Sequence, residues 1–457
     1  MKALLINPPS KFEKSTPLPL GLLYIASYLE KNGHKVKIID MKVEEIPLSK
    51  LKMEILDFGP DYIGIKCLTY EAKTVYSLSD FIKKIDKKYK IVLGGPHASA
   101  NPREVINEKS VDYVVSGEGE ITFEELLEGI TPSKIKGLVY KAGKSIKENP
   151  PREFIQDLDK MPLPAYHLIE VKKYFNNPYA HAFFKARKNI SQIFTSRGCP
   201  FQCIYCHKIF GKTIRYHSAE RVLKEIHLLY NLYGVREFQI EDDSFNVDMN
   251  RAKKIMSLIK QSGMKIKISF PNGIRADFID EDLVRKMRDA GVYSICFGVE
   301  SGDKEIQKFI RKNLNLEKVN AAIKLSTKYG ILTTGYFMMG FLDETKKQMM
   351  NTIQFAKNSK LHMATFFKVI PYPNTELYSL AKERGLTLSN NPGDYTYTFS
   401  TMKDIKMSKV DSQELDSLIK KAYFSFFSPL RMIRLGLKAP NKSMLFVHFF
   451  RLLFWKN

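Results

Sequence analysis

Three cysteines lie close together near the middle of the chain, with the spacing Cys199-x3-Cys203-x2-Cys206. They come directly after a predicted strand, Gln192–Ser196, and therefore share one loop at its carboxyl end. Three thiolates on one loop can ligate three of the four irons of a cubane cluster. The remaining iron then stays open to a small ligand, so the spacing predicts a reactive 4Fe–4S centre.

Three other interpretations of these cysteines stay open at this point. His207 could complete a tetrahedral zinc site, although only Cys67 and Cys296 remain elsewhere and they do not form a second ligand pair. Residues 203–207 also match the attachment motif of c-type haem, which belongs to exported proteins and leaves Cys199 unused. Inert buried cysteines are the third possibility, but such cysteines have no reason to cluster so tightly.

The segment from Cys199 to Cys206, with the aromatic Tyr205 before the third cysteine, resembles the signature loop of the radical S-adenosylmethionine superfamily. The resemblance implies that the open iron binds the amino and carboxylate groups of S-adenosylmethionine. It also implies that an electron from the reduced cluster cleaves the sulfonium to give a 5′-deoxyadenosyl radical. That radical would abstract hydrogen from an unactivated carbon.

The resemblance also implies contacts with S-adenosylmethionine from residues that follow later predicted strands. Carboxylates suit its amino group, and an arginine fork suits its carboxylate. For the acidic residues, capping of a helix is an equally good interpretation. Together with Tyr205, the expected contacts are Glu241, Asp242, Asp243, Arg275, Glu300 and Ser301.

Residues 186–400 contain six strand candidates that alternate with helical segments. Their starts are roughly 28 to 45 residues apart, the length of one βα unit. This pattern predicts a partial (β/α)6 barrel of the type that the resemblance also implies, with the site at the carboxyl ends of the strands. The strands are Gln192–Ser196, Glu237–Ile240, Lys265–Phe270, Ser294–Val299, Leu332–Met338 and Thr365–Ile370.

Residues 1–134 alternate short apolar runs with amphipathic segments, which predicts an α/β domain with a Rossmann-like parallel sheet. Its five strands are Lys2–Pro8, Lys35–Asp40, Tyr62–Leu68, Lys90–Pro96 and Asp112–Gly117. Glycines just after the last two strands would let a bulky ligand approach the backbone closely.

These glycines, with the prolines near the N-terminus, resemble the cobalamin-binding domain that precedes the barrel in one large radical subfamily. The expected cobalamin contacts are Gly94, Gly95, His97, Gly117 and Gly119, with His97 also suiting a turn or capping role. The better-known cobalamin domains carry a cobalt-ligating histidine in Asp-x-His, and this chain has Asp40-Met41-Lys42 instead. We therefore expect no lower ligand from this loop. The alternatives are a degenerate domain that has lost the cofactor and a Rossmann-like domain that binds a different ligand.

Residues 135–185 read as a hairpin and a proline-rich linker, and 401–457 as a mainly helical C-terminal extension. From Lys421 to Asn457 the chain holds seven Lys or Arg, nine aromatics and no Asp or Glu. This composition suits either a packed cap or peripheral contact with an anionic membrane.

Five cysteines, no signal-peptide pattern and no apolar run of ~18–20 residues point to a cytoplasmic protein. The net charge of +23 comes from scattered lysines, and no nucleic-acid partner is expected because no such module is recognisable.

The sequence thus predicts a radical S-adenosylmethionine enzyme with a 4Fe–4S cluster and cobalamin. It would modify, and by preference methylate, a carbon of a small or lipid-like substrate, with electrons from a donor such as flavodoxin or ferredoxin. A non-methylating cyclase or rearrangement enzyme is the alternative within enzymes. A corrinoid- or redox-sensing binding protein is the alternative from another class.

Overall fold

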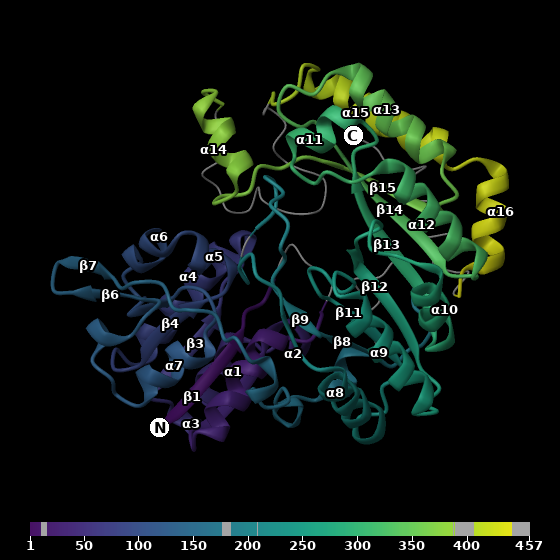
Figure 1. Cartoon of the computed structure of the whole chain (residues 1–457). Coiled ribbons are helices and arrows are strands. Elements are labelled where there is room, and N and C mark those ends of the chain that lie inside the picture. The colour runs from purple at the N-terminus through teal and green to yellow at the C-terminus, as the bar shows by residue number, and fades with distance from the viewer. Residues whose placement is uncertain (11–15, 176–183, 208, 387, 389–405, 441–457) are drawn as a thin grey trace. The chain divides into compact units, whose positions relative to one another are not determined.

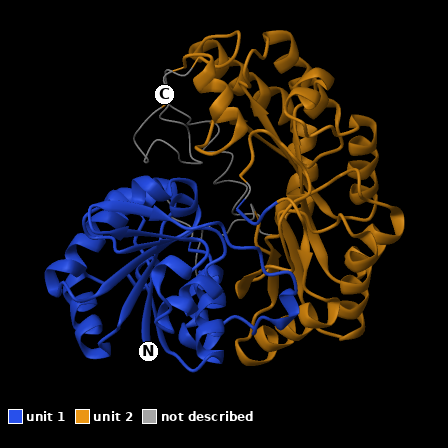
Figure 2. Ribbon diagram, turned by 60° about the vertical axis from the view of Figure 1, so that its left-hand side comes forward, with its two compact units in different colours: residues 1–179, 208–211, 389–397 blue, residues 180–207, 212–388, 398–457 orange. Residues whose placement is uncertain are grey.

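The computed structural model describes residues 1–10, 16–175, 184–207, 209–386, 388 and 406–440 (Figure 1). The chain divides into two compact units (Figure 2). The first is built mainly on residues 1–179, and the second on residues 180–207, 212–388 and 398–457.

The first unit contains a seven-stranded sheet of order β2-β1-β3-β4-β5-β6-β7. Strands β1 to β5 pair in parallel, which confirms the five predicted strands. Their carboxyl ends therefore share one edge of the sheet. They are β1 (Lys2–Asn7), β2 (Lys35–Asp40), β3 (Tyr62–Lys66), β4 (Lys90–Gly94) and β5 (Tyr113–Val115).

Side chains of the first unit's strands alternate between two helical layers, because successive strand residues point to opposite faces. Leu4 and Ile6 belong to the core beneath one set of helices, and Leu5 and Phe123 approach Gly64 from the other face. The first layer consists of α3 (Leu48–Phe58), α4 (Ala72–Ile85), α5 (Pro96–Ala100) and α6 (Pro102–Asn107). The second consists of α1 (Leu20–Lys31) and α7 (Glu120–Leu127), which pack together.

The hairpin β6 (Leu138–Ala142) and β7 (Ser145–Glu148) extends the sheet of the first unit. It pairs antiparallel with β5, so the unit continues past the boundary expected at residue 134. The proline-rich stretch also belongs here, because the hydroxyl of Tyr174 donates to Asp40 Oδ2 at 2.7 Å. The sequence predicts a boundary at residue 134 because it carries no local pattern for the pairing of a hairpin with the edge of a sheet.

The second unit contains a six-stranded parallel sheet in the order β15-β14-β13-β12-β11-β8. The two outer strands are not paired to each other in the described chain, so the barrel is partial, as predicted. The strands are β8 (Ile190–Ile193), β11 (Glu237–Ile240), β12 (Lys267–Ile274), β13 (Val292–Glu300), β14 (Leu332–Met339) and β15 (Met363–Lys368).

Each strand of this sheet is followed by a helix on the way to the next one (Figure 1). Buried apolar residues recur every three or four positions, as in Val222, Ile226 and Leu229 of α8, and fix the helices on the sheet. The helices are α8 (Ala219–Leu232), α9 (Met249–Gln261), α10 (Glu281–Asp289), α11 (Lys304–Phe309), α12 (Leu316–Lys328), α13 (Lys346–Asn358) and α14 (Glu376–Glu383).

Two further helices, α15 (Ser412–Phe426) and α16 (Pro429–Lys438), follow the sheet in the chain. The hydroxyl of Tyr423 accepts from the backbone N–H of Phe366 at 3.1 Å, which holds α15 against β15. The helical structure expected for 401–457 is confirmed over α15 and α16, whereas residues 401–405 and 441–457 lie outside the described residues. Across the described ranges, no helix is long and apolar enough to cross a membrane.

Candidate functional site

The cysteine loop leaves the carboxyl end of β8 and is closed at its base by a short antiparallel ribbon. The ribbon pairs β9 (Ser196–Arg197) with β10 (Arg215–Tyr216), which the sequence did not reveal. Within the loop, the backbone N–H of Cys206 donates to the carbonyl of Cys203 at 3.3 Å. Cys203 is buried and Cys206 is exposed. The loop therefore follows the carboxyl end of a strand, as the sequence predicted, while cluster binding by its three cysteines stays a prediction.

Tyr205 and Glu300 are brought together by Lys312, a residue that sequence reasoning missed. Lys312 Nζ lies 2.7 Å from Glu300 Oε1 and 3.4 Å from the hydroxyl of Tyr205. Glu300 has φ +66°, a left-handed conformation that is uncommon for a non-glycine residue. Such strain is tolerated where a side chain must be aimed, and here it ends β13 and directs Glu300 at Lys312.

The surroundings of Cys203 shift the pKa of its thiol in both directions. Burial raises the pKa of its thiol, Lys312 lowers it, and the nearby Glu300 and Cys199 raise it. Cys199 Sγ also lies 3.4 Å from the hydroxyl of Ser244. Cluster irons would stabilise the thiolates strongly, because a metal ion is the largest local charge in such a site. The donor set of Cys199, Cys203 and Cys206 therefore fits a 4Fe–4S cluster.

The three acidic residues after β11 do different things. The carboxylate of Asp242 binds residues at the ends of β8 and β9. It accepts hydrogen bonds from Thr195 N at 2.6 Å and from Ser196 Oγ at 2.7 Å. Burial raises the pKa of Asp243, and neighbouring His207 of the cysteine loop lowers it. Glu241 is half-buried. Asp243 therefore interacts electrostatically with the cysteine loop, and Asp242 positions the loop's base.

Arg275 supports the cysteine loop through a stacked ring. Its guanidinium makes a fork on Asp277, with distances of 2.8 and 2.6 Å, and donates to the carbonyl of Lys312 at 3.2 Å. The same group lies over the ring of Phe201, 3.7 Å from its centroid. Binding of the S-adenosylmethionine carboxylate by Arg275 stays a prediction. That carboxylate would compete with Asp277 for the guanidinium group.

Ser301 is buried and engaged by its neighbours. Its hydroxyl lies 3.0 Å from that of Thr352 and accepts from the backbone N–H of Asp303 at 3.1 Å. These contacts tie the end of β13 to α13. A direct contact of Ser301 with S-adenosylmethionine stays a prediction.

The expected cobalamin contacts of the first unit lie at the carboxyl edge of its sheet. Gly95 has φ +100°, and a Cβ there would approach the carbonyl of Cys67 at 3.2 Å. Gly117 has φ +85°, and a Cβ there would meet no atom within 4 Å, so space opens beside it. A Cβ on Gly119 would come within 3.1 Å of Ile25, whereas Gly94 is less crowded.

His97 is a packed residue of this edge. Its side chain is buried, and Nε2 lies 3.1 Å from the hydroxyl of Tyr76. Burial lowers the pKa of His97 to about 4, so the ring is neutral at physiological pH. These contacts favour the turn and capping interpretation, while contact with cobalamin stays a prediction.

The loop after β2 offers no histidine, and its charged side chains are already engaged. Asp40 accepts from Asn7 Nδ2 at 2.9 Å and from the backbone N–H of Lys42 at 3.0 Å. Lys42 Nζ lies 2.6 Å from Glu71 Oε1, and both side chains are buried. Glu71 Oε2 is buried without a hydrogen-bond partner among the described residues. The free space beside Gly117 and the close backbone approach at Gly95 are the features of this edge that fit a bulky ligand such as cobalamin.

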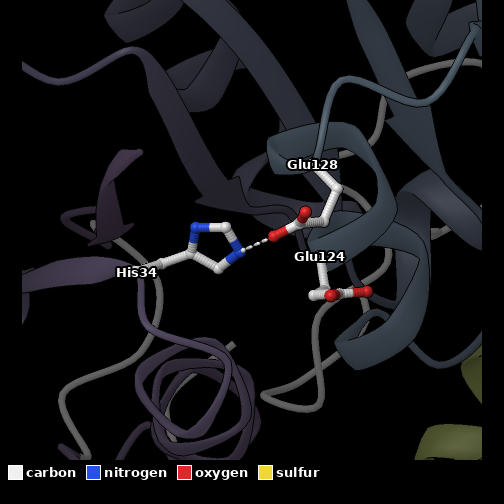
Figure 3. A group of neighbouring side chains, drawn as sticks. All are labelled: His34, Glu124 and Glu128. Carbon is white, nitrogen blue, oxygen red and sulfur yellow. Dashed lines mark ion pairs between the residues drawn. The ribbon is translucent and has the colours of Figure 1, made fainter.

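A further group of titratable side chains lies at the opposite edge of the sheet, where β2 begins. His34, Glu124 and Glu128 place their ligand atoms within 4.8 Å of one another (Figure 3). His34 Nε2 already faces Glu128 Oε1 at 3.2 Å. We interpret the group as an ion pair at the rim of the sheet, away from the edge that fits cobalamin.

Comparison with known proteins agrees with each of the two candidate sites. Residues 14–127 match the B12 binding domain, and residues 193–356 match the radical SAM superfamily. The uncharacterized methyltransferase PH0819 of Pyrococcus horikoshii is 35% identical over 93% of this chain and 92% of its own length. The cytidylyl-2-hydroxyethylphosphonate methyltransferase of Streptomyces wedmorensis is 28% identical over 82% of this chain and 80% of its own.

A solved structure shares the fold over most of the chain. It is the radical S-adenosylmethionine methyltransferase TsrM from Kitasatospora setae, with a tryptophan substrate and an S-adenosylmethionine analogue bound. The TM-score is 0.76 at 17% identity, covering 94% of this chain and 90% of that one. The similarity confirms the α/β architecture of an N-terminal domain followed by a partial barrel.

Proposed function

Because the chain belongs to the radical S-adenosylmethionine enzymes that carry an N-terminal B12-binding domain, we propose that it transfers a methyl group to an unactivated carbon of a small molecule. The observation that carries this proposal is the cysteine loop with Lys312, Glu300 and Tyr205 beside it. Two relatives that are named methyltransferases support the type of reaction.

Cys199, Cys203 and Cys206 would hold the 4Fe–4S cluster, and the carboxyl edge of the first sheet would hold cobalamin. The cluster supplies an electron for cleavage of S-adenosylmethionine, and cobalamin supplies a cobalt centre suited to methyl transfer. The protein's own task is to bind and orient both reactants, because positioning contributes a large part of such a rate enhancement.

Lys312 and Glu300 form the polar wall of the proposed S-adenosylmethionine site. Their ion pair is largely buried, with side-chain exposures of 12% and 11%, and neighbours Cys203. Lys312 would donate to the carboxylate of S-adenosylmethionine, and Glu300 would accept from its hydroxyl groups. Asp243 would accept from its amino group, because it lies on the same side as the cysteine loop.

Arg275 and Asp242 would act indirectly, by holding the cysteine loop and the neighbouring strands in place. Arg275 would support the cysteine loop through Phe201, and Asp242 would hold the ends of β8 and β9 together. We place the reaction in the cytoplasm, with reducing equivalents from a flavodoxin or ferredoxin. A lipid-like substrate and peripheral membrane contact are part of the same proposal.

The test is anaerobic incubation of reconstituted enzyme with a metabolite extract, a reductant and S-adenosylmethionine labelled on its methyl group. We expect label in a carbon-bound methyl of a new product with wild-type enzyme. Lys312→Met should lose most of this product, whereas Lys37→Met, which removes a partly exposed lysine of the first unit, should keep it. Formation of 5′-deoxyadenosine without carbon-bound label would favour a cyclase or rearrangement enzyme instead.

A further inference from the structure

Helix α16 exposes a stripe of large aliphatic side chains. Leu430, Ile433 and Leu437 are 69%, 60% and 77% exposed. Their spacing places them on one face of the helix, because residues three, four and seven positions apart align. Most large apolar side chains of this chain are buried, so a continuous exposed stripe marks a binding surface.

The opposite face of α16 is fixed to the second unit. Leu435 is 1% exposed and packs in a cluster with Met363 of β15. The guanidinium of Arg431 donates to the carbonyls of Lys357 and Ser359, at 3.0 and 2.7 Å, and so caps the end of α13. The helix therefore has a defined orientation, and the aliphatic stripe is its outward face.

Helix α16 carries positive charge beside the stripe and contains no acidic residue of its own. Arg434 and Lys438 are exposed on α16, and Arg434 forms no ion pair within the part of the chain that is described. The sequence contains no Asp or Glu after Asp416. Cations beside exposed aliphatics match the chemistry of an anionic bilayer, whose headgroups attract lysine and arginine while its acyl region accepts apolar side chains.

Helix α3 also exposes large aliphatic side chains, but it lacks the excess of positive charge that α16 has. Its Leu48, Met53 and Leu56 are also exposed, at 47%, 63% and 54%. The same helix carries Lys50, Lys52, Glu54 and Asp57, whose charges cancel, so it has no net charge that would attract an anionic surface. This helix supplies a matched control.

We propose that the stripe of Leu430, Ile433 and Leu437, with Arg434 and Lys438 beside it, docks the protein on an anionic lipid surface. The aliphatic side chains enter the boundary between headgroups and acyl chains, and the cations pair with lipid phosphates. An acidic protein fits this face less well than a bilayer does. The outermost side chains are apolar, and the cations lie along only one side of them.

The test uses the full-length protein and sedimentation with vesicles of phosphatidylcholine alone or of phosphatidylcholine with phosphatidylglycerol. We expect binding only to the vesicles that contain phosphatidylglycerol, and weaker binding at high salt because exposed charges are screened. Replacing Leu430, Ile433 and Leu437 with serine should weaken binding about tenfold or more. The equivalent serine variant at Leu48, Met53 and Leu56 should bind like the wild type.

Because all six replaced side chains are exposed, both triple variants should fold, and far-UV circular dichroism would verify this. The proposal is overturned if the wild-type protein ignores both kinds of vesicle, or if both triple variants bind equally well. It is also overturned if the α16 variant abolishes a concentration-dependent dimer, or capture of an acidic electron-transfer protein, without changing vesicle binding. Those results would assign the face to a second copy or to a protein partner.

Discussion

The ion pair between Lys42 and Glu71 yields the sharpest prediction about stability. Its atoms are 2.6 Å apart, and the side chains are 3% and 0% exposed. At an effective dielectric constant of about 20, the attraction is about 6 kcal/mol, which is offset by the cost of removing both charges from water. Lys42→Met leaves a buried carboxylate without its cation and should cost about 3–5 kcal/mol.

Urea unfolding of the full-length protein, followed by far-UV circular dichroism, measures this cost. The double variant Lys42→Met/Glu71→Leu should regain most of the loss, because apolar replacement of a buried pair is close to neutral. Lys37 and Glu54 provide a control, since they pair at the same 2.6 Å but are 31% and 30% exposed. Lys37→Met should therefore cost less than about 1 kcal/mol. An equal cost for Lys37→Met and Lys42→Met would refute the reasoning.

Three other variants test the site and its supports. Cys203→Ser should lose most iron and sulfide on anaerobic reconstitution, whereas the buried Cys296→Ser should keep them; equal iron content would contradict the cluster assignment. Gly298→Ala would place a Cβ 2.9 Å from Lys312 Nζ and should raise the KM for S-adenosylmethionine about tenfold, or about 1.4 kcal/mol, at unchanged iron content. Burial raises the pKa of Glu344 to about 7 from 4.5, so the native state retains a proton that the unfolded state loses. The free energy of unfolding should then fall by about 3 kcal/mol as pH rises from 4.5 to 7, and Glu344→Gln should remove this fall; an unchanged pH profile would show that the carboxyl is not desolvated.

The strands and the cysteine loop could be predicted because their signals are local. Short apolar runs separated by amphipathic helices specify βα units, and the three cysteines lie within a single loop. The hairpin β6–β7 could be predicted as a hairpin, but its pairing with β5 could not, since that depends on which sheet edge is free in space.

The division of labour among site residues was less predictable. Asp242 and Asp243 are adjacent in sequence, yet Asp242 accepts a hydrogen bond from Thr195, whereas the pKa of Asp243 is lowered by His207. Lys312 follows α11 in a turn and reaches Glu300 only through the fold. The positive φ of Arg311 and Asn313 on either side marks an irregular backbone, which the structure shows and the sequence does not.

The central claim is that the three cysteines support reductive cleavage of S-adenosylmethionine. Its most direct test is the amount of 5′-deoxyadenosine formed by anaerobically reconstituted enzyme with a reductant and S-adenosylmethionine. We predict formation by the wild type and by Cys296→Ala, and none above background by Cys203→Ala. A wild-type enzyme that carries its full complement of iron and forms no 5′-deoxyadenosine, or a Cys203→Ala enzyme that forms as much as the wild type, would contradict the account.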